Sequence, residues 1–171
     1  MTSRSPSPRT WTLQTSFSVL PKRRAEERMR EAIAIARTTP PGDVPVGAIV
    51  YGPGGEVVGV GTNRRLANCD PTAHAEVEAI RQAAKNLGTW RLDGCELVVT
   101  LEPCTMCAGA ILGARVSSLV FGAFEPKTGA VGSVLDALRD PRHLHTVEVR
   151  GGVLEAATSQ LMSTFFNGLR D

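Results

Sequence analysis

Four residues in two short motifs carry groups that could perform chemistry together. The motif DPTAHAE (70–76) contains His74 and Glu76, and LEPCTMC (101–107) contains Cys104 and Cys107. Zinc prefers imidazole and thiolate ligands, and three protein ligands leave a fourth tetrahedral position for water, as in catalytic zinc sites. Zinc lowers the pKa of its water to roughly 7. We therefore expect one Zn²⁺ held by His74, Cys104 and Cys107, with Glu76 as the carboxylate that moves protons.

Each motif alone has a simpler interpretation. HxE occurs in many helices, and CxxC is common in redox pairs and in halves of structural zinc sites. A structural site needs a fourth thiolate or imidazole. Cys95 opens an apolar strand and Cys69 precedes a helix in a turn, so neither suits that position. The open fourth position favours a catalytic ion, and the structural site remains the alternative.

The predicted helix of residues 73–86 positions the first pair. Glu76 lies beside its apolar stripe and His74 lies well round the helix, so both reach one ion only near the helix start. Cys104 and Cys107 are i, i+3 neighbours in a second predicted helix (104–115), with Pro103 expected at its first position. The pattern predicts two helix N-termini that face one ion.

The remaining chain alternates between helical and strand patterns. Helices are predicted at 24–38, 134–138 and 154–169, and strands at 44–51, 56–61, 95–100, 118–122 and 146–150. The first two strands form an antiparallel hairpin. The strands on either side of the 104–115 helix should be parallel, because such crossovers are right-handed. We expect a three-layer α/β/α sandwich around a mixed five-stranded sheet.

Composition indicates one soluble globular domain. The 171 residues are 42% hydrophobic and 21% charged, and no apolar run is long enough to span a membrane. Four cysteines favour a reducing compartment, so we expect a cytoplasmic protein. Residues 1–22 are rich in Ser, Thr, Pro and Arg and are predicted to be a disordered extension of a domain at 23–171. An organellar transit peptide or a start codon placed too far upstream remains open.

The charge distribution does not favour nucleic acid as a partner by itself. The net charge is +2, but five basic residues and no acidic residue lie in the first 25 positions, so the rest is near −3. Any RNA-binding surface must therefore be a local patch.

From about residue 24 to residue 170 the sequence resembles bacterial tRNA-specific adenosine deaminases, which have the cytidine deaminase-like fold. The motifs that carry the resemblance are DVPVGAIV, GTNRR, DPTAHAE, LEPCTMCAGAI, VFGAFEPKTGAVGS and FFNGLR. An H-x-E…P-C-x-x-C signature is typical of zinc deaminases that act on bases. Guanine deaminases share DPTAHAE and a similar PCxMC, so the segment 121–133 is what favours RNA. A free guanine, other nucleobase or nucleoside deaminase is the alternative.

The resemblance implies hydrolytic deamination of adenosine to inosine at the wobble position of a tRNA anticodon. Water activated by zinc attacks C6, and Glu76 carries the proton to N1 and then to the leaving amine. Asn63 hydrogen-bonds the purine, although a turn role is the simpler interpretation of this residue. The implied contacts are Val46, Gly47 and Ala48 around the pocket, Glu125 and Lys127 at the RNA backbone, and Phe165, Phe166 and Arg170 at the loop bases.

The sequence departs from the family at a few positions, and one assembly follows from the resemblance. Glu125 stands where Asp is usual, Phe124 replaces a frequently polar residue, and Leu144 stands where Asn commonly precedes His. His143 and His145 are predicted to be surface or packing residues rather than metal ligands. Relatives pair through helices near the site, so a homodimer is expected.

Overall fold

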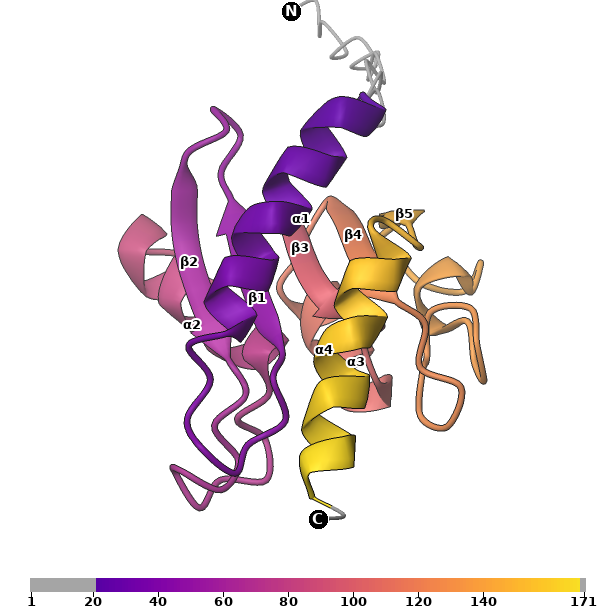
Figure 1. The fold of residues 1–171 in the computed structure, drawn as a ribbon. Helices are drawn as coiled ribbons and strands as arrows, with labels where there is room; N and C mark the ends of the chain where they lie inside the picture. Colours follow the sequence, from indigo (N-terminus) through magenta and orange to yellow (C-terminus); the bar gives the residue numbers. More distant parts are fainter. Residues whose placement is uncertain (1–20, 170–171) are drawn as a thin grey trace, which may run out of the picture.

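The computed structural model describes residues 21–169 (Figure 1). Most of the predicted N-terminal extension and Arg170 lie outside the described residues, whereas Lys22 already belongs to the first helix. Within residues 21–169, no helix combines the length and apolar character that a membrane crossing requires.

The described elements form one mixed sheet with helices on both faces. In chain order they are α1 (Lys22–Ala36), β1 (Gly47–Tyr51), β2 (Val57–Thr62), α2 (Ala75–Leu87), β3 (Glu96–Leu101), α3 (Thr105–Gly113), β4 (Ser118–Ala123), η1 (Ala137–Arg139), β5 (Glu148–Arg150) and α4 (Glu155–Gly168). The strand order is β2-β1-β3-β4-β5. β1 runs antiparallel to β2 and β3, and β4 runs parallel to β3 and β5. The predicted hairpin, crossover and mixed five-stranded sheet are confirmed.

Alternation along the central strands separates two buried layers. Ala48 and Val50 of β1 belong to the core that includes α2 and α3, and Ile49 and Tyr51 belong to the core that includes α1. Successive side chains of a strand point to opposite faces, so one apolar strand supplies both layers. Figure 1 shows α1 and α4 on one face of the sheet and α2 and α3 on the other. The three-layer sandwich is confirmed.

Glycines in β2 let α2 approach the sheet closely. A Cβ atom on Gly61 would lie 2.2 Å from the carbonyl oxygen of Ala75, and one on Gly59 would lie 2.3 Å from that of Ala79. These distances are shorter than any van der Waals contact. The α2 N-terminus can lie this close to β2 only because both positions are glycine, which has no side chain.

Several predicted boundaries differ from the structure. α3 begins at Thr105 with Cys104 as its N-cap, so Pro103 precedes the helix instead of occupying its first position. The predicted helix at 134–138 is a loop followed by the 3₁₀ turn η1, because backbone bonds from Val134 and Leu135 go back to Gly129. β1 begins at Gly47, three residues after the predicted start, because Pro45 lacks the N–H that a ladder needs.

Candidate active site

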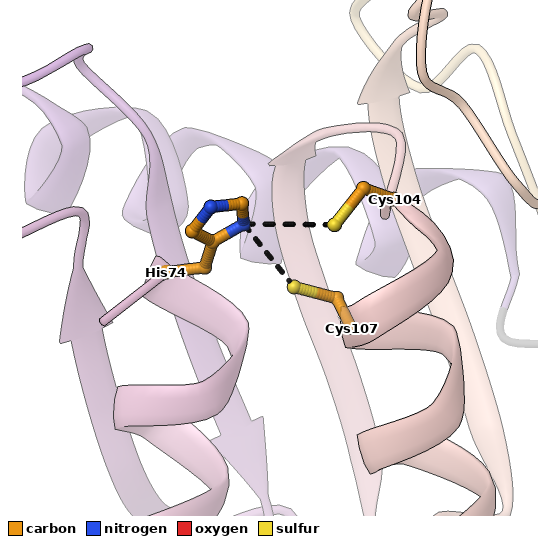
Figure 2. A group of neighbouring side chains, drawn as sticks. All are labelled: His74, Cys104 and Cys107. Carbon is orange, nitrogen blue, oxygen red and sulfur yellow. Dashed lines mark hydrogen bonds between the residues drawn. The ribbon is translucent and has the colours of Figure 1, made fainter. Parts of the chain in front are cut away.

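The three predicted zinc ligands meet between the starts of α2 and α3. His74 is the N-cap of α2, Cys104 is the N-cap of α3, and Cys107 lies in its first turn. Figure 2 shows the imidazole directed at both sulfur atoms, with His74 Nδ1 at 3.7 Å from Cys104 Sγ and 3.4 Å from Cys107 Sγ. A tetrahedral ion with Zn–S near 2.3 Å and Zn–N near 2.0 Å separates its sulfur and nitrogen ligands by roughly 3.5 Å. The donor set therefore fits zinc.

The two cysteines differ in their proton affinity. A hydrogen bond from the Cys107 thiol lowers the pKa of Cys104 to about 3, against the opposing effect of burial. The same hydrogen bond and burial raise the pKa of Cys107 well above its ordinary value. Two neighbouring thiolates repel each other, so the second cysteine can lose its proton only when a cation lies between the two sulfur atoms. The imidazole is the third ligand of that cation. Of the described residues, only these three form a group of His, Cys or acidic side chains close enough to share an ion.

Glu76 lies beside the metal ligands with its side chain enclosed by protein. It belongs to the first turn of α2 and is 4% exposed. Burial raises the pKa of the Glu76 carboxyl. A buried carboxyl with a raised pKa holds a proton more readily than a free carboxyl and can still return it, which is what a general acid and base requires.

His74, Glu76 and Cys104 line a cavity of about 170 Å³ at the carboxyl ends of β3 and β4. Ligands in open α/β sheets bind at this edge. Ligand pockets usually measure roughly 300–1,000 Å³, so this cavity suits a single small ring system. Its lining includes Val44, Val46, Asn63, Arg65, His74, Glu76, Leu101, Glu102, Cys104, Glu125, Thr128, Met162 and Phe166.

Asn63 combines the two roles that the sequence left open. Its side chain is largely buried and lines the cavity, and its carbonyl oxygen Oδ1 accepts a bond of 3.4 Å from the Arg65 backbone N–H. This hydrogen bond in the turn uses only the carbonyl oxygen of the side-chain amide. The –NH₂ group is a separate donor that a bound ring could accept from.

The structure does not bring every expected contact residue to the cavity. Of the β1 segment, Val46 lines it, but Gly47 and Ala48 do not. A Cβ on Gly47 would point at α1, 2.3 Å from the Ala32 carbonyl oxygen, and Ala48 packs in the core under α2. Alternation along the strand turns Gly47 to the opposite face, whereas Ala48 shares the face of Val46 but lies deeper, in the core.

The aromatic pair and Lys127 also separate. Phe166 is 45% exposed and lines the cavity, whereas half-buried Phe165 lines a second cavity of about 460 Å³ between α4 and the segment that follows α1. Their ring centroids lie 5.3 Å apart in an edge-to-face arrangement, and neither ring is fully buried. Lys127 is exposed outside the cavity, on the rim loop, by which we mean residues 124–133.

Glu102 is a residue of the site that sequence reasoning missed. The residue is 2% exposed, and its carboxylate accepts hydrogen bonds from the backbone N–H groups of Glu125, Val131 and Ser133 and from the Ser133 hydroxyl. Although burial opposes it, these bonds hold the pKa of Glu102 below its usual value. The donors lie more than twenty positions after Glu102 in the sequence, so no local pattern predicts these bonds. The only signal in the sequence is the acidic residue inside LEPC.

The opposite side of the cavity has a similar anchor. Buried Asp43 accepts the backbone N–H groups of Leu66 at 2.8 Å and Ala67 at 3.0 Å. It thereby fixes the turn that carries Arg65, a second missed lining residue. His145, expected to be a packing or surface residue, contacts the Val116 carbonyl oxygen through Nε2 at 2.6 Å and is not part of the metal group.

Comparison with known proteins agrees with this geometry. Residues 22–123 match the family model described as the cytidine and deoxycytidylate deaminase zinc-binding region. The chain is 47% identical over 147 residues to the tRNA-specific adenosine deaminase of Haemophilus influenzae, covering 85% of each chain.

Solved structures of the same fold give two functional comparisons. A structure from a study of A-to-I editing by tRNA:A34 deaminases superposes with a TM-score of 0.73 at 40% identity, covering 79% of this chain and 99% of that one. A guanine deaminase from Nitrosomonas europaea gives 0.68 at 30% identity, covering 82% and 83%. The chain therefore belongs to the zinc-binding cytidine and deoxycytidylate deaminase family, among relatives that include the tRNA-specific adenosine deaminases.

Proposed function

We propose that this protein hydrolyses adenosine to inosine at the wobble position of a tRNA anticodon. The observation that carries the proposal is the group of His74, Cys104 and Cys107 beside buried Glu76, in a cavity sized for one base. The similarity to tRNA-specific adenosine deaminases supports RNA as the substrate.

The residues divide the reaction among them. His74, Cys104 and Cys107 would hold the ion. When bound, zinc is a Lewis acid that supplies a water nucleophile at neutral pH. Glu76 would take one proton of this water and deliver it to N1 of the adenine, and would then carry the second proton, from the new hydroxyl at C6, to the leaving amine. A C6–O bond forms, the C6–N bond breaks, and the products are inosine and ammonia.

The cavity supports a base that has been turned out of its stack. An enzyme that acts on a base must extrude it into a pocket, which is easiest for an unpaired loop nucleotide. Asn63 would hydrogen-bond the purine while Val46 and Phe166 provide apolar contact. Glu125 and Lys127 of the rim loop, with Phe165 and Arg170 near the C-terminus, would contact the rest of the anticodon loop. Arg65 adds a cation at the opposite side.

The test is incubation of the zinc-loaded protein with an anticodon stem-loop that carries adenosine at the wobble position. We expect inosine, detected by nuclease digestion and mass spectrometry. A stem-loop with guanosine at that position and adenosine elsewhere in the loop is the control and should stay unchanged. No inosine from the first stem-loop would contradict the proposed substrate.

Free guanine is the second candidate, because the guanine deaminase shares the fold at 30% identity. A parallel incubation with guanine, read as loss of guanine and formation of xanthine, decides between them. The tRNA proposal predicts no turnover in that tube.

We also propose a cytoplasmic homodimer. Met106 at the start of α3 and Val134 and Leu135 next to the rim loop are exposed apolar side chains, and an isolated bridge between Cys104 and Gly129 brings these segments together. Such a patch suits an interface. Sedimentation at micromolar concentration should give twice the monomer mass, and a single monomeric species would contradict the dimer. The cytoplasmic location rests on the tRNA substrate.

A further inference from the structure

We propose that Glu102 is a positioning residue whose carboxylate sets the conformation of the rim loop for binding RNA. The proposal rests on the proposed function for the identity of the substrate. Its structural part, that one buried carboxylate holds the loop, stands on contacts that do not depend on any ligand.

All the acceptor capacity of the Glu102 carboxylate is directed at one loop. Oε1 accepts the N–H groups of Val131 and Ser133, each at 3.0 Å, and Oε2 accepts the N–H of Glu125 at 3.0 Å together with the Ser133 hydroxyl. A carboxylate offers about four lone-pair positions, and these four donors use them. Glutamine in the same place would turn an –NH₂ group toward donors and lose about half of these bonds.

The close approach of the loop depends on a glycine. A Cβ on Gly129 would lie 2.5 Å from Cδ of Glu102 and 2.4 Å from the carbonyl oxygen of Glu125. The backbone adds two fixed points, because Ala130 N–H donates to the Pro103 carbonyl oxygen at 2.9 Å and Gly129 bridges to Cys104. The loop is therefore drawn against the segment that carries a proposed metal ligand.

The loop held in this way presents the groups expected to meet RNA. Glu125 and Thr128 line the cavity and Lys127 is exposed just outside it. The Glu102 carboxylate only accepts hydrogen bonds and carries no group that the proposed chemistry uses. A loop that is ordered before binding saves the entropy of ordering it on the RNA, so its release should weaken binding more than turnover.

The experiment compares Glu102→Gln with the wild type in two measurements. Amide hydrogen exchange of Glu125, Val131 and Ser133 should accelerate by about tenfold or more, since hydrogen bonds to a charged acceptor are lost. For the wobble-adenosine stem-loop, KM should rise about tenfold while kcat per zinc-loaded molecule changes by less than about threefold. Zinc content should stay at the wild-type level.

Asp43→Asn is the matched control, because Asp43 is also a buried carboxylate that accepts backbone N–H groups. It should accelerate exchange at Leu66 and Ala67 and leave the rim-loop amides protected. If Glu102→Gln does not fold, Ser133→Ala removes one of the four donors and keeps the carboxylate. Faster exchange at Glu125 and Val131 with a smaller rise of KM is then expected.

Unchanged exchange in the rim loop would overturn the proposal, as would faster exchange with an unchanged KM. Loss of zinc with normal kinetics in the zinc-loaded fraction would show a merely structural role and would also overturn it. If the wild type makes no inosine, the proposed function fails, and the exchange data still decide whether Glu102 holds the loop.

Discussion

Glu76 combines burial with a place next to the metal ligands, and this separates its role from theirs. Its carboxylate is not needed to complete the donor set of His74, Cys104 and Cys107. Glu76→Ala should therefore retain zinc and lose turnover by about 10²- to 10⁴-fold, the contribution of a positioned acid and base. Single-turnover inosine formation and elemental analysis check both parts. Glu76→Gln keeps the volume and should be equally inactive, whereas an active Glu76→Ala enzyme would remove the assigned mechanism.

Asn63 is the residue for which two roles can be separated by substitution. Asn63→Ala removes both the turn acceptor and the proposed donor to the purine, and Asn63→Asp keeps only the acceptor for Arg65 N–H. If the purine contact matters, both variants should lose roughly tenfold in kcat/KM, the value of one hydrogen bond. Asn63→Asp with wild-type kcat/KM would show that the turn is the whole role.

At the scale of elements, the position of the site depends on how closely α2 packs on β2. Gly61→Ala would place a Cβ 2.2 Å from the Ala75 carbonyl oxygen, in the turn that carries His74 and Glu76. Overpacking of this kind costs about 1–3 kcal/mol. We expect a lower free energy of unfolding in urea and weaker zinc binding in a competition assay.

Gly109→Ala is the control for that substitution. Gly109 lies inside α3, and a Cβ there meets no atom within 4 Å. Alanine in a helix interior is favoured over glycine by up to about 1 kcal/mol. This variant should therefore be as stable as the wild type or slightly more stable, and equal destabilisation by both variants would contradict the packing argument.

The elements that the sequence predicted well are those with local signals. The apolar spacing of α2 and the continuous apolar run of β3 determine those elements by themselves, and the two motifs placed the metal group at two helix starts. What the sequence could not show depends on distant partners. The anchoring roles of Glu102 and Asp43 come from backbone groups more than twenty positions away.

Two expectations differ from the structure for separate reasons. Val46, Gly47 and Ala48 were treated as one pocket segment, but the pleat turns Gly47 toward α1. Pro103 fitted the rule for a first helical position, yet Cys104 is the N-cap because its place is tied to Gly129 by a bridge. The orientation of Gly47 thus follows from the local pleat, whereas the helix start at Cys104 lies beside a segment that is distant in the sequence.

At the scale of the whole molecule, the core does not depend on the ion. The two apolar clusters fill both faces of the sheet, and the metal group lies at one edge. Chelation should therefore lower Tm by about 5–10 °C, because an ion at about 100 times its Kd adds about 2.7 kcal/mol. The far-UV circular dichroism spectrum at 25 °C should persist. His74→Ala should show no chelator effect, and unfolding on chelation would contradict this account.

Charge determines how RNA binding should respond to salt. The net charge of the chain outside the first 25 residues is near −3, so attraction to RNA must come from a few cations at the cavity rather than from the whole surface.

Lys127 is exposed on the rim loop, and each lysine that meets a phosphate of single-stranded RNA adds about 0.7 to the slope of log K against log salt. Lys127→Ala should reduce that slope by about 0.7, measured by fluorescence anisotropy with the stem-loop. Lys85→Ala, at the far end of α2, removes the same charge and should leave the slope unchanged. Equal slopes for all three proteins would mean that Lys127 meets no phosphate.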